Sequence, residues 1–246
     1  MLVSIITATY NSAATLHDCL QSVAMQSYAP IEHIIIDGVS KDDSLSIAQS
    51  FAHIAQVHSE KDQGIYDAMN KGIALATGDI IGILNSDDFY VDERVIQDIV
   101  TVFENSNCDV VYADLQYVDR ERTDKIIRTW KSGTMQQRSF LYGWMPPHPT
   151  VFVRRKVYEQ YGAFNLSLKS AADYEFMLRV LYKEKCPVAY LPKTIVKMRD
   201  GGQSNQSIKH RIFANREDKK AWALNGLQPY FFTLLLKPAR KLIQYF

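Results

Sequence analysis

Val3-Ser4-Ile5-Ile6-Thr7-Ala8-Thr9 decides the fold class of this 246-residue chain. The run is apolar and β-branched without strict alternation, which is typical of a strand buried on both faces of a parallel sheet. His33–Asp37 repeats the pattern after a helical stretch that follows the cap at Asn11-Ser12. Two buried strands joined by a helix predict an α/β fold, with a mostly parallel sheet covered by helices on both faces.

The alternation of strands and helices continues through the first half of the chain. Apolar runs predict three more strands, and apolar residues spaced three or four apart predict the helices between them. The expected strands are Ala55–His58, Ile80–Leu84 and Asp109–Ala113, and the expected helices are Leu45–Phe51, Tyr66–Ala76 and Val95–Phe103.

The pattern changes after about Leu115. The segment to Trp130 mixes alternation with charge, as antiparallel strands at a sheet edge do. Three prolines make Met145–Pro149 a rigid loop. A strand at Thr150–Val153 and an apolar helix at Asp173–Tyr182 follow. Neither a repeat nor a Gly- or Ser-rich linker divides the sequence, so we expect a single domain.

The composition excludes several classes of protein. A net charge of +1 is too small for a duplex-binding protein, which usually carries a strong basic excess. The three cysteines are scattered and lack metal-type spacing, so they fit a reducing compartment and a structural role. We expect no signal peptide, and the apolar stretch near the end is far shorter than the ~20 residues of a membrane span. A cytoplasmic protein is the expectation.

Polar side chains follow each predicted strand. Ligands of an open parallel sheet bind outside the carboxyl ends of its strands, so these residues form the expected site. The sequence contains neither G-x-G-x-x-G nor a P-loop, which argues against a dehydrogenase or a P-loop enzyme. The residues are Thr9-Tyr10-Asn11, Asp37-Gly38, Glu60-Lys61-Asp62 and Asn85-Ser86-Asp87-Asp88.

Asp87 and Asp88 are the most informative pair. Adjacent carboxylates repel, so keeping both ionised requires a cation nearby. Mg²⁺ or Mn²⁺ prefers oxygen and is typically held by one or two carboxylates plus the phosphates of a substrate. The alternative is that one of the two caps a helix beginning near Asp92-Glu93, and from these residues alone both interpretations stay open.

Five short stretches occur along the chain in the order Ser4–Asn11, Ile34–Gly38, Asp62–Gly72, Leu84–Asp88 and Ala172–Glu175. Each motif is short, and the signal comes from their combination. With them the chain resembles the family 2 glycosyltransferases, which are inverting enzymes with the GT-A fold, a Rossmann-like α/β architecture. The resemblance covers about residues 1–191.

The resemblance implies a donor site in residues 1–114. Asp87 and Asp88 match the acidic motif that coordinates Mn²⁺ or Mg²⁺ on the diphosphate of a nucleotide sugar. Asn85 stands where the family usually has a first Asp. The implied contacts to the nucleotide sugar are Thr9, Tyr10, Asp37, Asp62, Asn85 and Asp87.

Two of these positions have particular features. Asp37 matches the acid that reads the nucleobase, but many members have two acids where this chain has Asp37-Gly38. Asp62 matches a nucleotide-contacting position, and it lies just before a predicted helix. A helix cap at Asp62 is therefore an equal alternative.

The resemblance implies an acceptor site in residues 115–228. Asp173 matches the catalytic base, which a single displacement with inversion needs to take the proton of the acceptor hydroxyl. The family often has Glu before this Asp, and here the residue is Ala172. Glu175 is an alternative base, and Asp173 as a simple N-cap is the structural alternative.

Other features are less specific. His148 lies in the proline loop and is a candidate contact to acceptor or phosphate. Trp130 and Trp144 suit stacking on sugars, although core packing is the default for an aromatic side chain. The polar loop Asp200–Asn205, with Gln203, is a candidate lid over the donor or an ordinary turn.

The tail at 229–246 combines aromatic and aliphatic residues with Lys237, Arg240 and Lys241. That composition is typical of an interfacial segment, and packing on the domain or on a partner subunit is the alternative. We expect the domain to span 1–228 and the tail to contact the inner face of the plasma membrane.

The implied activity is metal-dependent transfer of a sugar, with a UDP-sugar as the expected donor, to a saccharide or lipid-linked saccharide in bacterial surface polysaccharide assembly. The alternatives are an inactive nucleotide-sugar-binding protein and a nucleotidyltransferase on a similar sheet. The latter requires phosphate-binding Gly and Lys residues after the first strand, which Thr9–Ser12 does not supply.

Overall fold

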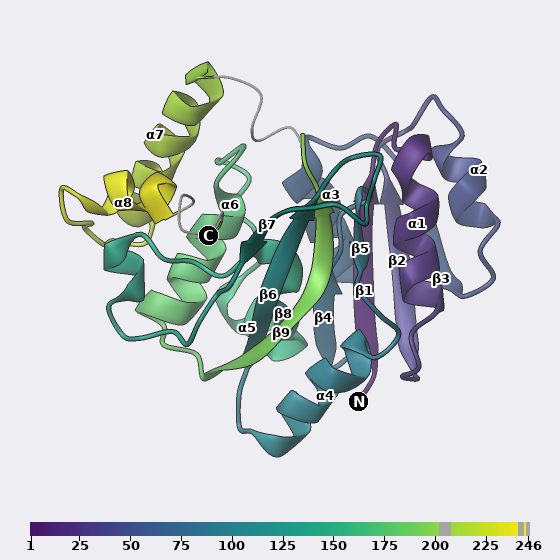
Figure 1. Ribbon diagram of the computed structural model, residues 1–246, viewed down its shortest axis with the longest axis horizontal. Helices are drawn as coiled ribbons and strands as arrows, with labels where there is room; N and C mark the ends of the chain where they lie inside the picture. The colour runs from purple at the N-terminus through teal and green to yellow at the C-terminus, as the bar shows by residue number, and fades with distance from the viewer. Residues whose placement is uncertain (202–207, 241–243, 245–246) are drawn as a thin grey trace.

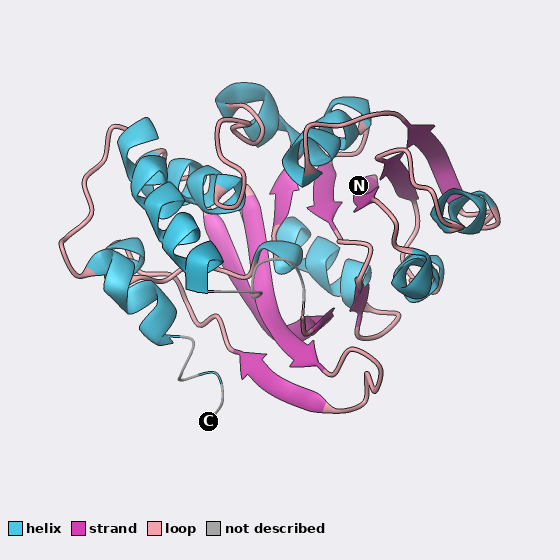
Figure 2. Ribbon diagram, turned by 90° about the horizontal axis from the view of Figure 1, so that it is seen from above, coloured by secondary structure: helices cyan, strands magenta, loops and turns pink. Residues whose placement is uncertain are grey.

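The computed structural model describes residues 1–201, 208–240 and 244. These residues form one nine-stranded sheet with helices on both faces (Figure 1 and Figure 2). The strand order is β3-β2-β1-β4-β8-β6-β9-β5, and β7 pairs with β6 outside this path. The α/β class predicted from the sequence is confirmed.

The first half of the sheet is parallel, as predicted. Thr9 pairs with Asp37 and Asp37 pairs with Ser59, so the carboxyl ends of three strands lie at one level. The four strands are β1 (Val3–Thr9), β2 (Ile31–Asp37), β3 (Ile54–Ser59) and β4 (Ile80–Ile83).

The second half of the sheet is mixed, so the parallel arrangement holds for only part of it. β8 (Phe152–Arg154) runs antiparallel to both β4 and β6 (Val110–Val118). β6 forms the expected antiparallel pair with β7 (Ile126–Trp130). The strand predicted from Thr150 begins at Phe152 instead, because His148–Thr150 forms a 3₁₀ turn around Pro149.

A long strand, β9 (Val188–Arg199), lies parallel to β6 and ends beside the acidic motif. Its last residues pair antiparallel with β5 (Asp88–Tyr90), in the register Asp88 to Met198. The sequence patterns predicted neither this pairing nor β5. The pairing matters because it brings residue 199 next to Asp87 and Asp88.

Helices cover both faces of the sheet. One buried cluster joins α3 (Ile65–Leu75), α5 (Arg155–Tyr161) and α6 (Ala172–Met177) to Ile6 and Ile34. On the other face, α1, α2 and α4 pack against Ile5 and Ile35. These helices span Ala13–Ala24, Ser44–Gln49 and Val95–Asn105.

Close packing fixes the helix α3 that follows Asp62. A Cβ at Gly72 would lie 2.3 Å from Cγ2 of Ile6, so only glycine lets α3 approach β1 this closely. Ile6 and Ile34 are fully buried beneath the helix. Each such side chain stabilises the fold by about 1.5–3 kcal/mol relative to exposure.

The remaining helices lie beside the acceptor half. α6 continues into a wider turn at Leu178–Lys183, so the helix predicted at Asp173–Tyr182 is present. α7 (Ile208–Leu224) packs on α6, and α8 (Thr233–Ala239) packs on α7 and on the 3₁₀ turn Ser139–Tyr142. Over the described ranges, no helix combines the length and apolar character needed to cross a membrane.

Candidate active site

Asp37 organises the loop that follows β2. Its carboxylate is fully buried and accepts hydrogen bonds from the amide and hydroxyl of Ser40 and from the hydroxyl of Ser59. Ser40 Oγ in turn accepts a 2.9 Å bond from the amide of Asn11. The residue expected to read the nucleobase therefore holds the loops after β1, β2 and β3 together.

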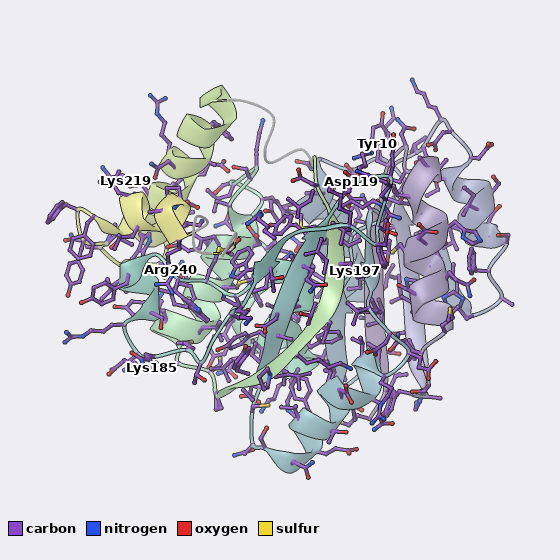
Figure 3. All side chains as sticks on the ribbon, in the orientation of Figure 1. Tyr10, Asp119, Lys185, Lys197, Lys219 and Arg240 are labelled. Carbon is purple, nitrogen blue, oxygen red and sulfur yellow. The ribbon has the colours of Figure 1, made fainter. Side chains whose placement is uncertain are left out.

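Tyr10, Gly38 and Asp62 meet at the rim of the sheet. A Cβ on Gly38 would lie 2.6 Å from Oδ2 of Asp62 and 3.3 Å from the ring of Tyr10. A side chain at position 38 would therefore require the carboxylate of Asp62 to move. Tyr10 is 57% exposed and lies at the edge of the molecule (Figure 3), whereas Thr9 is buried.

Asp62 does not cap α3. The N-cap of the helix is Gly64, and Oδ1 of Asp62 accepts the Gly64 amide at 2.8 Å in a turn that precedes the helix. The alternative of a helix cap is therefore wrong at this position. Asp62 remains partly exposed and able to contact a ligand.

The acidic motif lies where β4 leads into β5. Asp88 is fully buried, and its Oδ2 accepts a 2.9 Å hydrogen bond from the amide of Asn85. Its Oδ1 has no hydrogen-bond partner among the residues that the structure describes. Burial, and then the charge of Asp87, raise the pKa of Asp88 well above its ordinary value. The nearby charge of Arg199 lowers this pKa but does not offset the two effects that raise it.

Neither residue of this pair caps a helix. The N-cap of α4 is Arg94, whose amide donates to Oδ1 of Asp92 at 2.9 Å. The structure therefore rules out the capping alternative for Asp87 and Asp88. The short segment Asn85–Asp87 is held instead by α1, since Thr15 Oγ1 donates to the backbone carbonyl of Ser86 at 3.0 Å.

Arg199, at the end of β9, is a site residue that the sequence patterns did not reveal. Its guanidinium donates to the backbone oxygen of Asp87 at 2.8 Å and pairs with the carboxylate of Asp18 on α1. Its side chain is buried and lies over the ring of Phe89. A fixed cation therefore lies beside the acidic motif.

The acidic motif fits a hard dication. Mg²⁺ and Mn²⁺ prefer oxygen ligands. The motif offers Oδ1 of Asp88, which has no partner among the described residues, and the carboxylate of the adjacent Asp87. Within the described part of the chain, no group of three His, Cys, Asp or Glu side chains gathers in a metal-binding arrangement. Asp87 and Asp88 would thus hold a metal together with phosphate oxygens of the donor.

Asp173 lies in the first turn of α6, after the N-cap Ala171. It is not the cap, so that alternative is wrong. Its Oδ1 accepts a 2.9 Å hydrogen bond from the hydroxyl of Tyr66 on α3. The residue is partly exposed, so its carboxylate can be reached from solvent.

His148 lies close to Asp173. Burial lowers the pKa of His148, and the negative charge of Asp173 opposes that shift. The imidazole ring meets Phe164 edge-on, with the ring centres 5.5 Å apart. The structure therefore places the two residues near one another on the acceptor side.

Glu175 is committed to the core. It is buried, forms a two-pronged ion pair with Arg179, and accepts a hydrogen bond from Asn225. These contacts argue against Glu175 as the alternative base. They make it an anchor between α6 and the end of α7.

The other candidates resolve simply. Trp144 is buried and donates its ring N–H to the carbonyl of Ser132 at 2.7 Å, and Trp130 packs on the core. Both have the default structural role. Gln203 lies outside the described residues. The three cysteines are buried and free, as expected.

Known proteins share both the sequence pattern and the fold. Residues 4–162 match the family described as glycosyl transferase family 2. A PGL/p-HBAD biosynthesis glycosyltransferase of Mycobacterium bovis is 30% identical over 218 residues, which cover 87% of this chain and 82% of that one. An uncharacterized glycosyltransferase of Mycobacterium tuberculosis is 33% identical over 180 residues, which cover 72% of this chain and 68% of that one.

Solved structures agree on the fold. S. aureus TarS (residues 1–349), in complex with UDP-GlcNAc, superimposes with a TM-score of 0.71 at 18% identity, covering 99% of this chain and 73% of that one. A mannosyltransferase from Pyrobaculum calidifontis, in complex with GDP-Man and Mn²⁺, gives 0.67 at 17% identity, covering 98% and 69%. The GT-A-type fold expected from the motifs is confirmed. The chain belongs to glycosyl transferase family 2 and is a glycosyltransferase.

Proposed function

We propose that this glycosyltransferase is metal-dependent and inverting, and that it moves a sugar from a nucleotide-diphosphate sugar, favouring a UDP-sugar, to a saccharide or lipid-linked saccharide. The observation that carries the proposal is the buried Asp88, whose carboxylate has an oxygen without a described partner beside Arg199 and Asp87. This pair lies at the carboxyl end of the parallel sheet, where a donor binds in such folds.

Donor binding is assigned to the rim formed by the loops after β1 to β4. Tyr10, which is exposed, and the carboxylate of Asp62 meet beside Gly38, and we assign the nucleobase to these two side chains. Asp87 and Asp88 would hold the metal, and Asn85 orients Asp88. A divalent cation bound there would neutralise the charge that develops on the leaving diphosphate.

Transfer is assigned to Asp173. The acceptor oxygen attacks the anomeric carbon as the bond from that carbon to the phosphate oxygen breaks. The carboxylate of Asp173 takes the hydroxyl proton, and the nucleoside diphosphate leaves with the electron pair of the broken bond. Asp173 suits this role because it is partly exposed and lies outside the acidic motif.

Two observations support a surface-glycan pathway and a peripheral membrane contact at the inner face of the plasma membrane. The mycobacterial relative is a biosynthetic glycosyltransferase for PGL/p-HBAD. α8 docks on the domain through Thr233 and Lys237, while Phe231 and Leu235 remain 91% and 64% exposed. Phe231 and Leu235 line one surface hollow together with Arg216 and Lys219, and exposed apolar residues beside cations suit an anionic lipid surface.

The test is a panel of UDP-glucose, UDP-N-acetylglucosamine and GDP-mannose, each with and without Mn²⁺. Thermal stabilisation measures binding, and release of the nucleoside diphosphate measures turnover. Binding without turnover on every acceptor offered would favour the inactive-binder alternative. Undiminished turnover in excess chelator would contradict the proposed metal dependence. The family match already argues against a nucleotidyltransferase.

A further inference from the structure

Tyr66 and Asn70 lie one helical turn apart on α3, so they share a face of the helix. Both belong to the Asp62–Gly72 stretch, which the sequence assigned to the donor half. Both side chains nevertheless make their hydrogen bonds to the acceptor half. The stretch is therefore a bridge between the two halves of the site.

Asn70 fixes the loop that lies before α6. Its Nδ2 donates to the carbonyl of Phe164 at 2.9 Å, and its Oδ1 accepts the amide of Phe164 at 2.9 Å. A side chain that pairs with both backbone groups of one residue sets the position of that residue. Phe164 is consequently held at a fixed place against α3.

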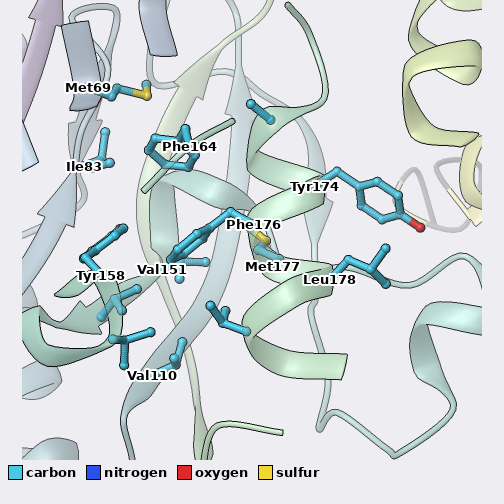
Figure 4. Close-up of a cluster of buried hydrophobic side chains, with 14 of the residues drawn as sticks. Met69, Ile83, Val110, Val151, Tyr158, Phe164, Tyr174, Phe176, Met177 and Leu178 are labelled. Carbon is cyan, nitrogen blue, oxygen red and sulfur yellow. The ribbon is translucent and has the colours of Figure 1, made fainter. Parts of the chain in front are cut away.

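Aromatic packing fixes the ring of Tyr66. Its centre lies 5.5 Å from that of Phe164, and Phe164 lies 5.4 Å from Phe176 of α6. Figure 4 shows Phe164 between Met69 of α3 and Phe176. The ring of Tyr66 thus packs on Phe164, which in turn packs on α6, and this packing aims its hydroxyl.

The hydroxyl of Tyr66 contacts one oxygen of Asp173. It donates to Oδ1 at 2.9 Å across a sequence separation of 107 residues. Burial, and then the charge of Asp173, raise the pKa of Tyr66 well above its ordinary value, so the phenol keeps its proton and remains a donor. With Oδ1 engaged, Oδ2 is the oxygen left to accept a proton.

We propose that Tyr66 is a positioning residue for transfer: its hydroxyl holds Oδ1 of Asp173 so that Oδ2 meets the acceptor hydroxyl. This inference rests on the proposed role of Asp173 as the base. It assigns to α3 the task of coupling donor and acceptor sites, because the same helix follows Asp62 and carries Tyr66. A base misplaced by about 1 Å can cost 10²-fold in rate.

The test compares Tyr66→Phe with Tyr190→Phe. Tyr66→Phe keeps the ring packing and removes only the hydroxyl. Tyr190→Phe is a matched control, because it also removes a tyrosine hydroxyl that donates to an aspartate: Tyr190 donates to Oδ1 of Asp114 at 2.8 Å. Turnover is measured as nucleotide release from the most active donor of the panel with Mn²⁺, and donor affinity and melting temperature are measured separately.

We expect Tyr66→Phe to lower kcat by about 10- to 100-fold with donor Kd changed less than about twofold, and Tyr190→Phe to keep its kcat. In an Asp173→Asn background, Tyr66→Phe should have no further effect, since its action passes through Asp173. If Tyr66 were merely structural, Tyr66→Phe would lower kcat by the same factor in the wild-type and Asp173→Asn backgrounds, and that result would overturn the inference.

Two other results separate the inference from the proposed function. Near-normal kcat in Tyr66→Phe, with Asp173→Asn inactive, would overturn the role of Tyr66 and leave the base in place. Near-normal kcat in Asp173→Asn would show that Asp173 is not the base and would contradict the proposed mechanism. Weaker donor binding or a lower melting temperature in Tyr66→Phe would show that Tyr66 is structural and would overturn the inference.

Discussion

Arg199 donates a 2.8 Å hydrogen bond to the backbone oxygen of Asp87 and pairs with Asp18 on α1. The guanidinium therefore ties the end of β9 to the acidic motif and to the helix behind it. Because a planar guanidinium satisfies two partners at once, it fixes the backbone from which Asp87 and Asp88 project. The site thus contains a permanent cation next to its expected metal ligands.

The first prediction concerns this cation. Arg199→Ala should weaken donor binding by about tenfold or more and lower the melting temperature, because the Asp87 carbonyl loses a charged donor. Arg199→Lys should be intermediate, since an ammonium cannot reproduce the forked contact. Donor titration of both variants checks this. Equal donor affinity in wild type and Arg199→Ala would show that Arg199 has no part in the donor site.

The second prediction concerns Asp88. Asp88→Asn should remove metal-stimulated turnover and lose at least about 100-fold in Mn²⁺ affinity, since even outer-shell changes cost about 10–100-fold. In chelator the variant should melt at the same or a higher temperature than wild type, because it no longer buries a carboxylate beside Asp87. Thermal unfolding with chelator or Mn²⁺ measures both effects. Asp124→Asn, on the exposed surface, is the control.

The third prediction concerns pH. His33 is fully buried between Thr7 and His53, and burial, followed by the charge of His53, lowers its pKa to about 3. The unfolded chain takes up a proton at His33 below about pH 6.5, and the folded chain does not. The unfolded state binds more protons, so stability is lost as pH falls from about 6.5 towards 3.

Unfolding by urea at pH 7 and at pH 4 measures this loss, which we expect to be on the order of a few kcal/mol. His33→Gln should reduce the change in the free energy of unfolding between pH 7 and pH 4. His17→Gln, at an exposed position, should leave that change as it is in the wild type. If His33→Gln retains the full slope, the acid sensitivity arises elsewhere.

The sequence predicted what local patterns encode. β1 to β4 follow from apolar runs, and Asp87-Asp88 stands out because two adjacent carboxylates are costly without a cation. Arg199 could not be found in this way, because its importance depends on β9 pairing with β5. The contact from Tyr66 to Asp173 joins residues far apart in the chain through the packing of α3 on α6. Neither contact leaves a signal in spacing or periodicity.

The departure at Gly38 shows the same limit. Sequence comparison presents it as a missing acid, whereas the structure shows Asp62 in the space that a side chain at 38 would fill. A pattern records which residue is present, and the fold shows which neighbour lies against it. The acidic side chain at this rim is supplied by Asp62 instead.

The fourth prediction concerns the base. Asp173→Asn keeps the size of the side chain and its hydrogen bond to Tyr66 but cannot accept a proton. Transfer should fall by about 10²–10⁴-fold, while donor and Mn²⁺ binding stay normal. Single-turnover transfer and donor titration separate the two. Asp98→Asn on α4, where the carboxylate pairs with Lys193, is the control. Collapse of donor binding would make Asp173 structural.

The last prediction concerns the surface formed by α7 and α8. Deleting residues from Pro229 onward removes the Thr233 bond to the carbonyl of Leu141 and the Lys237 pair with Asp218. Lys237 also lies 3.6 Å from the ring centre of Tyr174, the neighbour of Asp173. Truncation is therefore expected to lower both stability and turnover. A test of membrane binding needs changes that leave these contacts intact.

Phe231→Ser with Leu235→Ser meets that need, because both side chains are exposed. Each substitution removes exposed apolar area, whose burial in a membrane contributes about 25 cal/mol per Å² to the binding free energy. The double variant should therefore lose most of its binding to anionic liposomes and keep its turnover. The matched control is Met25→Ser with Ile126→Ser, which removes exposed apolar side chains elsewhere. Cosedimentation with phosphatidylglycerol vesicles at low and high salt measures binding. Salt-sensitive binding that only the first pair abolishes supports a membrane-facing surface. Equal binding by both double variants would exclude it.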